Sequence, residues 1–266
     1  MPIEDADLAE ITKLLSPERL GKLHELTGNS RAAVEFHQKT LRLGADLMAI
    51  IAVIEIALRN SICDNLGAHF AQAGWLLTPP APFQWKDSER NKITQALDSA
   101  RRAEYSKLPQ ADKHALDALA FPNGRPANLP HTLRSKRRRE HLQVTDGKII
   151  AELTFYIWKR LCGPDYEHTL WRPTLKKVFP NKRVKRSDVA DNLEMVYQAR
   201  NRLAHHEPVL YNRFEETIKA ITYIAQHLEA RVPSDQTPLY RLIAEDIVAV
   251  EESAAKLHAE LDAYRT

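Results

Sequence analysis

The residue types that could do chemistry gather at the end of one stretch, residues 188–206, whose pattern predicts a helix. Arg200 and His205 lie five positions apart there, and a proline at 208 ends the stretch. Apolar residues recur in steps of four and three, and Arg200 falls on the same line as Val189, Leu193, Val196 and Leu203. A guanidinium on such a line needs a partner. In a helix the α-carbons of Arg200 and His205 are about 7–8 Å apart, a span that an arginine side chain can close toward a shared substrate.

This pairing suits cleavage of an RNA phosphodiester bond. A histidine titrates near neutral pH, so its imidazole can take a proton from a ribose 2′-OH or give one to a leaving 5′-oxygen. An arginine can hold the phosphate with two hydrogen bonds and offset the charge that develops on it. Attack by the RNA's own 2′-OH needs no metal. Spacing alone leaves a second interpretation open, in which Arg200 and His205 are solvated side chains at a helix end.

A metal site is a poorer interpretation of the same residues. His205, His206 and Glu207 are adjacent, so their side chains diverge around a helix, and no second ligand cluster accompanies them. We therefore expect neither a metal nor a cofactor. The nine other histidines are scattered along the chain, and we expect them to be structural or solvent-facing.

The helices that must position these residues follow from periodicity and from helix breakers. The pattern predicts a first helix over 5–26, interrupted at Ser16-Pro17, and a long one over 31–70 whose section 47–58 is apolar on nearly every side. An N-cap is expected at Ser187 or Asp188. The further predicted helices are 88–108, 110–120, 149–158, 188–206, 213–230 and 237–264.

The middle of the chain is expected to decorate this helical core. Residues 75–86 form a proline-rich loop with Trp75 and Trp85 as anchors, and residues 75–146 together look like an insertion. Asp146-Gly147 is expected to be a turn before the helix at 149–158, whose bulky residues predict a buried face.

Composition bounds the class of protein. The chain has 266 residues, 44% of them hydrophobic, with 8 Gly and 2 Cys, which excludes a disordered chain and a disulfide scaffold and favours a mostly helical protein. Cys63 and Cys162 are isolated, so we expect buried, reduced thiols. No apolar run reaches the roughly 20 residues of a membrane span, and the acidic N-terminus is unlike a signal peptide, which predicts a cytoplasmic protein.

The net charge of +3 hides an uneven distribution. Residues 131–213 hold 18 basic and 9 acidic residues, a net +9, and the rest of the chain is at −6. Two basic runs carry most of the excess. The first is Arg134, Lys136, Arg137, Arg138 and Arg139, and the second, over 172–186, includes Lys182, Arg183, Lys185 and Arg186. A charge run is usually a solvated face, but these two precede the proposed site and concentrate the positive charge of the chain, so we expect them to contact RNA phosphates.

Three strings resemble the Abi-like, or abortive-infection, proteins of the HEPN superfamily. RNRLAHHEPV at 200–209 resembles their R-N-x3-H signature of metal-independent ribonuclease activity, IEIALRN at 54–60 their E-x-x-L-R-N helix, and GKIIAELTFYIW at 147–158 their G-K-I-x-x-E-L-x-F-x-x-W segment. The resemblance covers about 30–230. Tyr156 stands where the family often has Gly, and Gly44 where Asn is frequent.

The resemblance implies an all-α HEPN-type helical bundle that is one domain over 1–266. Its core helices would be about 30–70 and 147–231, with the insertion at about 75–146 and a C-terminal helix at about 237–264. It also implies a homodimer in which two Arg/His helices face each other across a cleft.

Site roles are implied residue by residue. Arg200 and His205 would be the catalytic pair, with Asn201 holding the geometry and His206 and Glu207 as auxiliary groups. From the long helix, Glu55, Arg59 and Asn60 would support them. Glu55 and Arg59 have an alternative interpretation as an i,i+4 ion pair in the core.

The function that follows is an endoribonuclease for single-stranded RNA, used in phage defence or as a toxin and leaving a 2′,3′-cyclic phosphate. A regulatory non-coding RNA or an antitoxin is a possible further partner. An alternative is a catalytically inactive HEPN module that binds RNA or protein. A third, a toxin silenced by nucleotide transfer, is disfavoured because such toxins carry R-x4-H-x-Y and this chain has Glu207 in place of the tyrosine.

Overall fold

The computed structural model describes residues 4–265, and within them the chain forms helices joined by loops, with no strand. This confirms the all-α class. In chain order the α-helices are α1 (Asp5–Leu15), α2 (Pro17–Thr27), α3 (Ser30–Phe70), α4 (Asp87–Lys107), α5 (Gln110–Ala120), α6 (His131–Glu140), α7 (Asp146–Ala151), α8 (Phe155–Leu161), α9 (Arg186–Ala204), α10 (Asn212–His227) and α11 (Pro238–Asp262). Short 3-10 and π turns at Pro164–Tyr166, Glu167–Trp171 and Leu175–Val178 connect α8 to α9.

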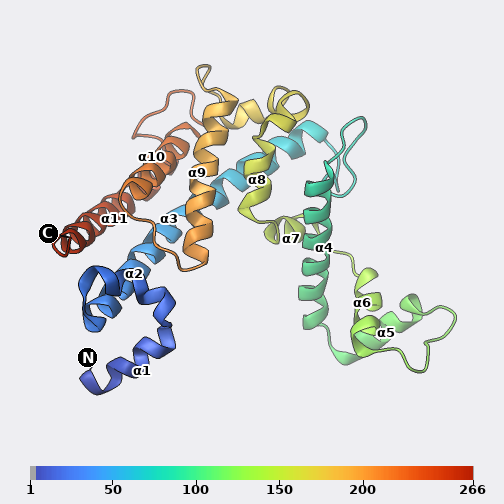
Figure 1. Cartoon of the computed structure of the whole chain (residues 1–266). Coiled ribbons are helices and arrows are strands. Elements are labelled where there is room, and N and C mark those ends of the chain that lie inside the picture. Colours follow the sequence, from blue (N-terminus) through green and yellow to red (C-terminus); the bar gives the residue numbers. More distant parts are fainter. Residues whose placement is uncertain (1–3, 266) are drawn as a thin grey trace.

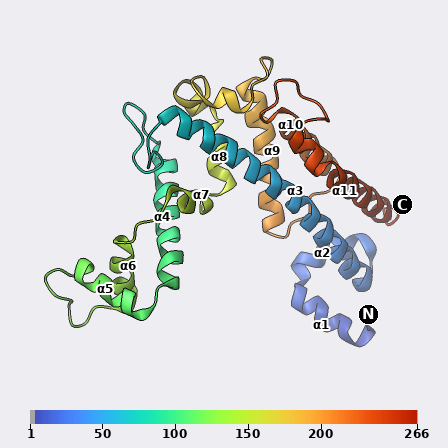
Figure 2. The same cartoon turned by 180° about the vertical axis from the view of Figure 1, so that it is seen from behind.

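The 41-residue helix α3 is the spine of the molecule. Asn29 begins it by accepting hydrogen bonds from the backbone N–H groups of Arg31 and Ala32, at 2.8 and 3.2 Å. Helices α2, α8, α9, α10 and α11 pack along it, as Figures 1 and 2 show from opposite sides. The predicted all-round burial of section 47–58 is wrong in part. One face, including Leu47, Ile54 and Leu58, is buried, whereas Ile56 is 48% exposed.

Local signals place the early helix boundaries as expected. The Ser16 hydroxyl accepts from the backbone N–H of Arg19, and Pro17 is the first residue of α2. Gly28, at φ 61°, ends α2 in the left-handed conformation that glycine adopts without strain. The predicted interruption at Ser16-Pro17 is therefore confirmed.

Three expectations in the middle of the chain are wrong. The first basic run, for which no helix was predicted, forms α6, and Asp146-Gly147 begins α7 instead of making a turn. The predicted helix over 149–158 is two helices, because the chain is not helical at Leu153 and Thr154 before α8 begins. Leu153 is buried in the core there, so tertiary packing outweighs the local helical pattern.

The predicted N-cap at Ser187 or Asp188 is also displaced. Helix α9 begins at Arg186, one residue earlier, with Lys185 as its cap and no capping side chain. The Arg186 guanidinium is held by the Glu167 carboxylate at 3.1 Å and by the carbonyl of Cys162 at 3.0 Å. These contacts draw Arg186 into the first turn.

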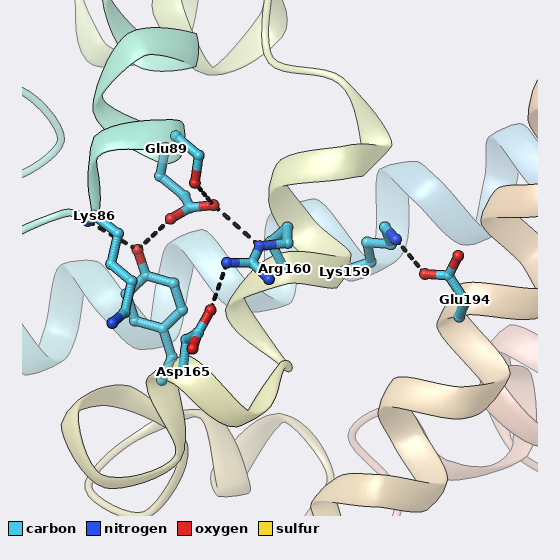
Figure 3. A network of polar contacts seen from close by, with 8 residues as sticks. Lys86, Glu89, Lys159, Arg160, Asp165 and Glu194 are labelled. Atoms are coloured by element: carbon cyan, nitrogen blue, oxygen red, sulfur yellow. Dashed lines mark hydrogen bonds and ion pairs between the residues drawn. The ribbon is translucent and has the colours of Figure 1, made fainter.

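Helices α4, α5 and α6 form an arm that extends from the end of α3 (Figures 1 and 2). Trp75 and Trp85, the expected anchors of its loop, are buried. The arm is joined to the core by a buried carboxylate, Glu89 of α4, which accepts from the Tyr166 hydroxyl at 2.7 Å and the Arg160 guanidinium at 3.1 Å (Figure 3). Burial opposes the charge on Glu89, but these hydrogen bonds and one from Ser88 hold its pKa below the usual value.

The far end of the arm is held by charge more than by apolar packing. Helix α5 has no buried residue. Asp117 of α5 instead receives two hydrogen bonds from the guanidinium of Arg138, both at 2.7 Å, and is also paired with Arg134. The hydrogen bonds from Arg138 and Arg134 lower the pKa of Asp117 far below its usual value.

Within residues 4–265, none of the helices combines the length and apolar character that crossing a bilayer requires. Both cysteines are free thiols. Cys162 is buried as expected and Cys63 is only half-buried, and burial raises the pKa of each to about 12, which keeps them in the unreactive thiol form.

The Asp117 contacts predict that Asp117→Asn opens the end of the arm. Arg134 and Arg138 lose their common anion, so amide hydrogen exchange over residues 110–140 should speed up about tenfold or more while α3 is unchanged. In the wild type the stability that these contacts contribute is fully present above the usual aspartate pKa of about 4, and it is lost as the pH falls from there through the depressed pKa of the folded state. Asp112→Asn, an exposed carboxylate on the same helix, is the control, and equal exchange in both variants would contradict this account.

Candidate functional site

The candidate site lies where the C-terminal half of α9 meets α3. Leu203 of α9 approaches α3 at Gly44, where an added Cβ would be 3.0 Å from the Leu203 Cδ2 atom. Val189, Leu193 and Val196 are buried as predicted, and the fourth buried position is Ala199 instead of Arg200. Arg200 is half-buried at the edge of the buried line.

Among charged groups, Arg200 has the largest effect on Glu55 of α3. Burial raises the pKa of Glu55, and the charges of Arg200 and then Arg59 oppose that rise, as does the backbone N–H of Phe155 at the start of α8. Glu55 therefore lies among α3, α8 and α9. In the part of the chain that the structure describes, neither arginine makes an ion pair within 4 Å of it, so the i,i+4 pair of Glu55 with Arg59 is not closed.

Arg59 and Asn60, the other two expected supports, lie together one turn along α3. The Arg59 Nε donates to the Asn60 Oδ1 at 3.4 Å, and Asn60 is exposed. The charge of Arg59 acts on both Glu55 and Cys63, so Arg59 lies beside the site.

His205 is the residue that caps α9 at its C-terminus. Its backbone N–H donates to the carbonyls of Asn201 and Arg202, both at 3.1 Å, and its side chain is exposed. The carbonyl of Asn201, which was expected to hold the geometry, takes part here only in this main-chain hydrogen bond. Arg200 and His205 thus share one end of one helix, the first able to bind an anion and the second able to move a proton.

Residues 205–211, which we call the 205–211 loop, connect α9 to α10. His206 has a positive φ of 58°, and its carbonyl accepts from the guanidinium of Arg19 on α2 at 3.0 Å. The Glu207 carboxylate pairs with Arg202 at 2.9 Å, and its N–H donates to the Arg202 carbonyl. His206 and Glu207 therefore shape the loop.

Sequence reasoning missed the partners of this loop. Arg19 is 187 positions from His206, so no local pattern connects them. His37 of α3, expected to be merely structural or solvent-facing, is buried beside them, and burial together with the charges of Arg19 and His206 lowers its pKa. A neutral His37 places no extra positive charge under the loop.

An apolar hollow of about 310 Å³ lies beside the loop. Its lining comes from α3, including Gly44 and Met48, from the end of α9 at Leu203, and from His206 and Pro208. The hollow is bordered by the exposed Leu41. It offers apolar contact area next to the Arg200 and His205 end of α9.

The first basic run is mostly occupied by contacts within the protein. Arg138 is 4% exposed and bound to Asp117, Arg134 shares that carboxylate, and Arg139 faces Asp98 at 3.6 Å. Expecting all five cations on an open face is wrong for Arg138, because a buried guanidinium needs its carboxylate. Lys136 and Arg137 are exposed, the latter beside Glu140 at 3.4 Å.

The second basic run divides in the same way. Arg172 and Arg186 both bind Glu167, and the Lys176 ammonium donates to main-chain carbonyls, where burial lowers its pKa. Lys182, Arg183 and Lys185 remain exposed. They precede the first turn of the 19-residue helix α9, so they lie about 27 Å or more from its His205 end. The structure does not bring either run next to Arg200 and His205.

Among residues 4–265 no group of three or more His, Cys, Asp or Glu side chains is arranged to hold a metal ion. His205, His206 and Glu207 are all exposed, and Glu207 is engaged by Arg202.

Comparison with known proteins yields no match. No family model matches the chain, and neither a curated protein nor a solved structure matches it.

The close approach of α9 to α3 predicts the effect of a side chain at position 44. Gly44→Val places its Cβ and methyl groups against Leu203, so we expect about 1–3 kcal/mol of lost unfolding free energy in urea denaturation. Gly21→Val is the control, because no atom lies within 4 Å of its added Cβ, and we expect a change within about 0.5 kcal/mol. A Gly44→Val protein as stable as the control would show that α9 does not need the close contact.

Proposed function

We propose that this protein is a metal-independent endoribonuclease for single-stranded RNA, of the HEPN type that its RNRLAHHEPV string resembles. The observation that carries the proposal is the pairing of a half-exposed Arg200 with an exposed His205 at one end of α9. We place its action in the cytoplasm, in phage defence or as a toxin, under the control of a regulatory RNA or antitoxin.

The Arg200 and His205 side chains suit a transesterification in which the phosphorus of the RNA backbone passes from the 5′-oxygen to the neighbouring 2′-oxygen. The 2′-oxygen forms a bond to phosphorus and loses its proton, while the bond to the 5′-oxygen breaks and that oxygen gains a proton. The His205 imidazole serves one of these proton transfers, and Arg200 binds the phosphate and offsets its developing charge. Glu55 orients Arg200 through their electrostatic attraction.

One protomer offers one His205, whereas the reaction needs both a base and an acid. A second copy supplies the other imidazole if two α9 ends face each other, and α3 offers a surface for this. Its solvent side carries a stripe, at steps of four, three, four and four, of Leu41, Ala45, Met48, Ala52 and Ile56. Leu41 and Ile56 are 38% and 48% exposed, and such a contiguous apolar surface is typical of a two-fold interface.

The catalytic proposal predicts cleavage of single-stranded RNA in the presence of EDTA. The products carry a 2′,3′-cyclic phosphate and a 5′-OH, and one 2′-deoxy substitution at the cleaved position abolishes cleavage there. Arg200→Ala and His205→Ala should each slow cleavage by about 100-fold or more, because each removes a group that acts in the transition state.

Matched controls separate chemistry from surface charge. His141→Ala removes another exposed histidine that caps a helix C-terminus, that of α6, and Arg241→Ala removes an exposed arginine of α11. Both should cleave as the wild type does. Cleavage that survives Arg200→Ala and His205→Ala would overturn the catalytic assignment. A gel mobility shift of RNA without any cleavage would instead favour the inactive RNA-binding module.

The dimer proposal predicts that Ile56→Glu weakens self-association. A carboxylate on the apolar stripe would have to be buried between the copies, so the dimer dissociation constant should rise about tenfold or more in sedimentation equilibrium. Val248→Glu alters a comparably exposed apolar residue of α11 and should leave the dimer dissociation constant unchanged. A monomeric wild type, or equal weakening by both variants, would count against the stripe as the interface.

A further inference from the structure

The 205–211 loop ends at Tyr211, whose backbone is in an unusual conformation. Its φ of 52° with ψ of −134° is costly for a residue with a side chain, so surrounding contacts must hold it. One of these contacts is specific. The Tyr211 backbone N–H donates to the Nε2 atom of His258 on α11, at 3.0 Å.

This hydrogen bond exists in only one charge state of His258. An imidazole nitrogen accepts a hydrogen bond only when it is unprotonated, whereas in the imidazolium both nitrogens are donors. The stacking of the His258 ring on the Tyr211 ring, with centroids 4.3 Å apart and planes at 15°, and the edge contact with Phe214 keep the ring in place. Protonation would therefore set two donors against each other.

The charged groups around His258 come from each neighbouring element. Burial lowers its pKa, Asp262 of α11 and Glu215 of α10 oppose that change, and Arg265 supports it. Asp262 is itself engaged by the Tyr211 hydroxyl and by Arg265, each at 3.0 Å. On the α3 side, Lys39 is paired with Glu260. The neutral form is therefore the resting form near neutral pH.

We propose that His258 is a positioning residue, whose neutral imidazole holds the 205–211 loop in its working shape and whose protonation releases the Tyr211 end of that loop. The inference rests on the proposed ribonuclease activity for its functional consequence, because the loop begins at His205. Its other end is held by Arg19 and by the Arg202–Glu207 pair, which do not depend on His258. Acid conditions would thus free the Tyr211 end of the loop that begins at His205.

The direct test follows the Tyr211 amide by NMR hydrogen exchange between about pH 5 and pH 8. In the wild type its protection factor should fall about tenfold on acidification, as the hydrogen bond is lost. In His258→Gln, whose amide oxygen accepts at any pH, protection should persist across the range. In His258→Phe, which keeps the stacking but has no acceptor, protection should be low throughout.

His227→Gln is the matched control. His227 also stacks on a tyrosine, Tyr223, with ring centroids 4.0 Å apart, but its Nδ1 lies 2.8 Å from the carbonyl of that same residue in α10. This variant should follow the wild-type profile. Pairing exchange with RNA cleavage adds a second measurement, in which His258→Gln should keep more of its activity in acid than the wild type does.

A wild-type Tyr211 amide whose protection does not change with pH would overturn the proposal, as would equal protection in His258→Phe and His258→Gln. If His258→Phe does not fold, the comparison of His258→Gln with the wild type still decides. The exchange measurement needs no nuclease activity, so an absence of cleavage refutes the proposed function without affecting this inference.

Discussion

Burial of one face of α3 is the constraint on which the rest of the structure depends. This helix presents a line of large aliphatic side chains, among them Leu47, Ile54 and Leu58, that is too long for any single neighbour to cover. Helices from both ends of the chain, α2 and α11, therefore pack against it together with α8, α9 and α10. The hydrophobic effect is not directional, so it selects this layered arrangement but does not set the exact position of each helix.

Polar contacts fix the relative positions of helices that apolar packing leaves undetermined. The carboxylate of Glu89 is fully buried, and it is stable there because Tyr166, Ser88 and Arg160 all donate to it. Arg160 in turn binds Asp165, and the neighbouring Lys159 binds Glu194 of α9 (Figure 3). Two consecutive residues of α8 thus orient the arm on one side and α9 on the other.

The candidate site follows from this arrangement. Helix α9 lies close to α3 because Gly44 admits Leu203, and that contact brings Arg200 within the field of Glu55. The loop that follows is held by α2 through Arg19 and by α11 through His258. Elements from the beginning and the end of the chain therefore meet at the seven residues of the 205–211 loop, although Arg19 and His258 are far from that loop in sequence.

Local sequence patterns predicted most of the helices and some of their boundaries. The apolar periodicity predicts where the chain is helical, and Ser16-Pro17 and Gly28 predict where helices end, because these signals act within a few residues. The spacing of Arg200 and His205 could be recognised in the sequence for the same reason. The contacts between side chains of different helices depend on how those helices pack. The tertiary structure buried Arg138 against Asp117, moved Arg200 to the edge of the core line, and joined Arg19 to His206 and Tyr211 to His258. Those pairs depend on how helices far apart in the chain pack, and one-dimensional spacing carries no information about that packing.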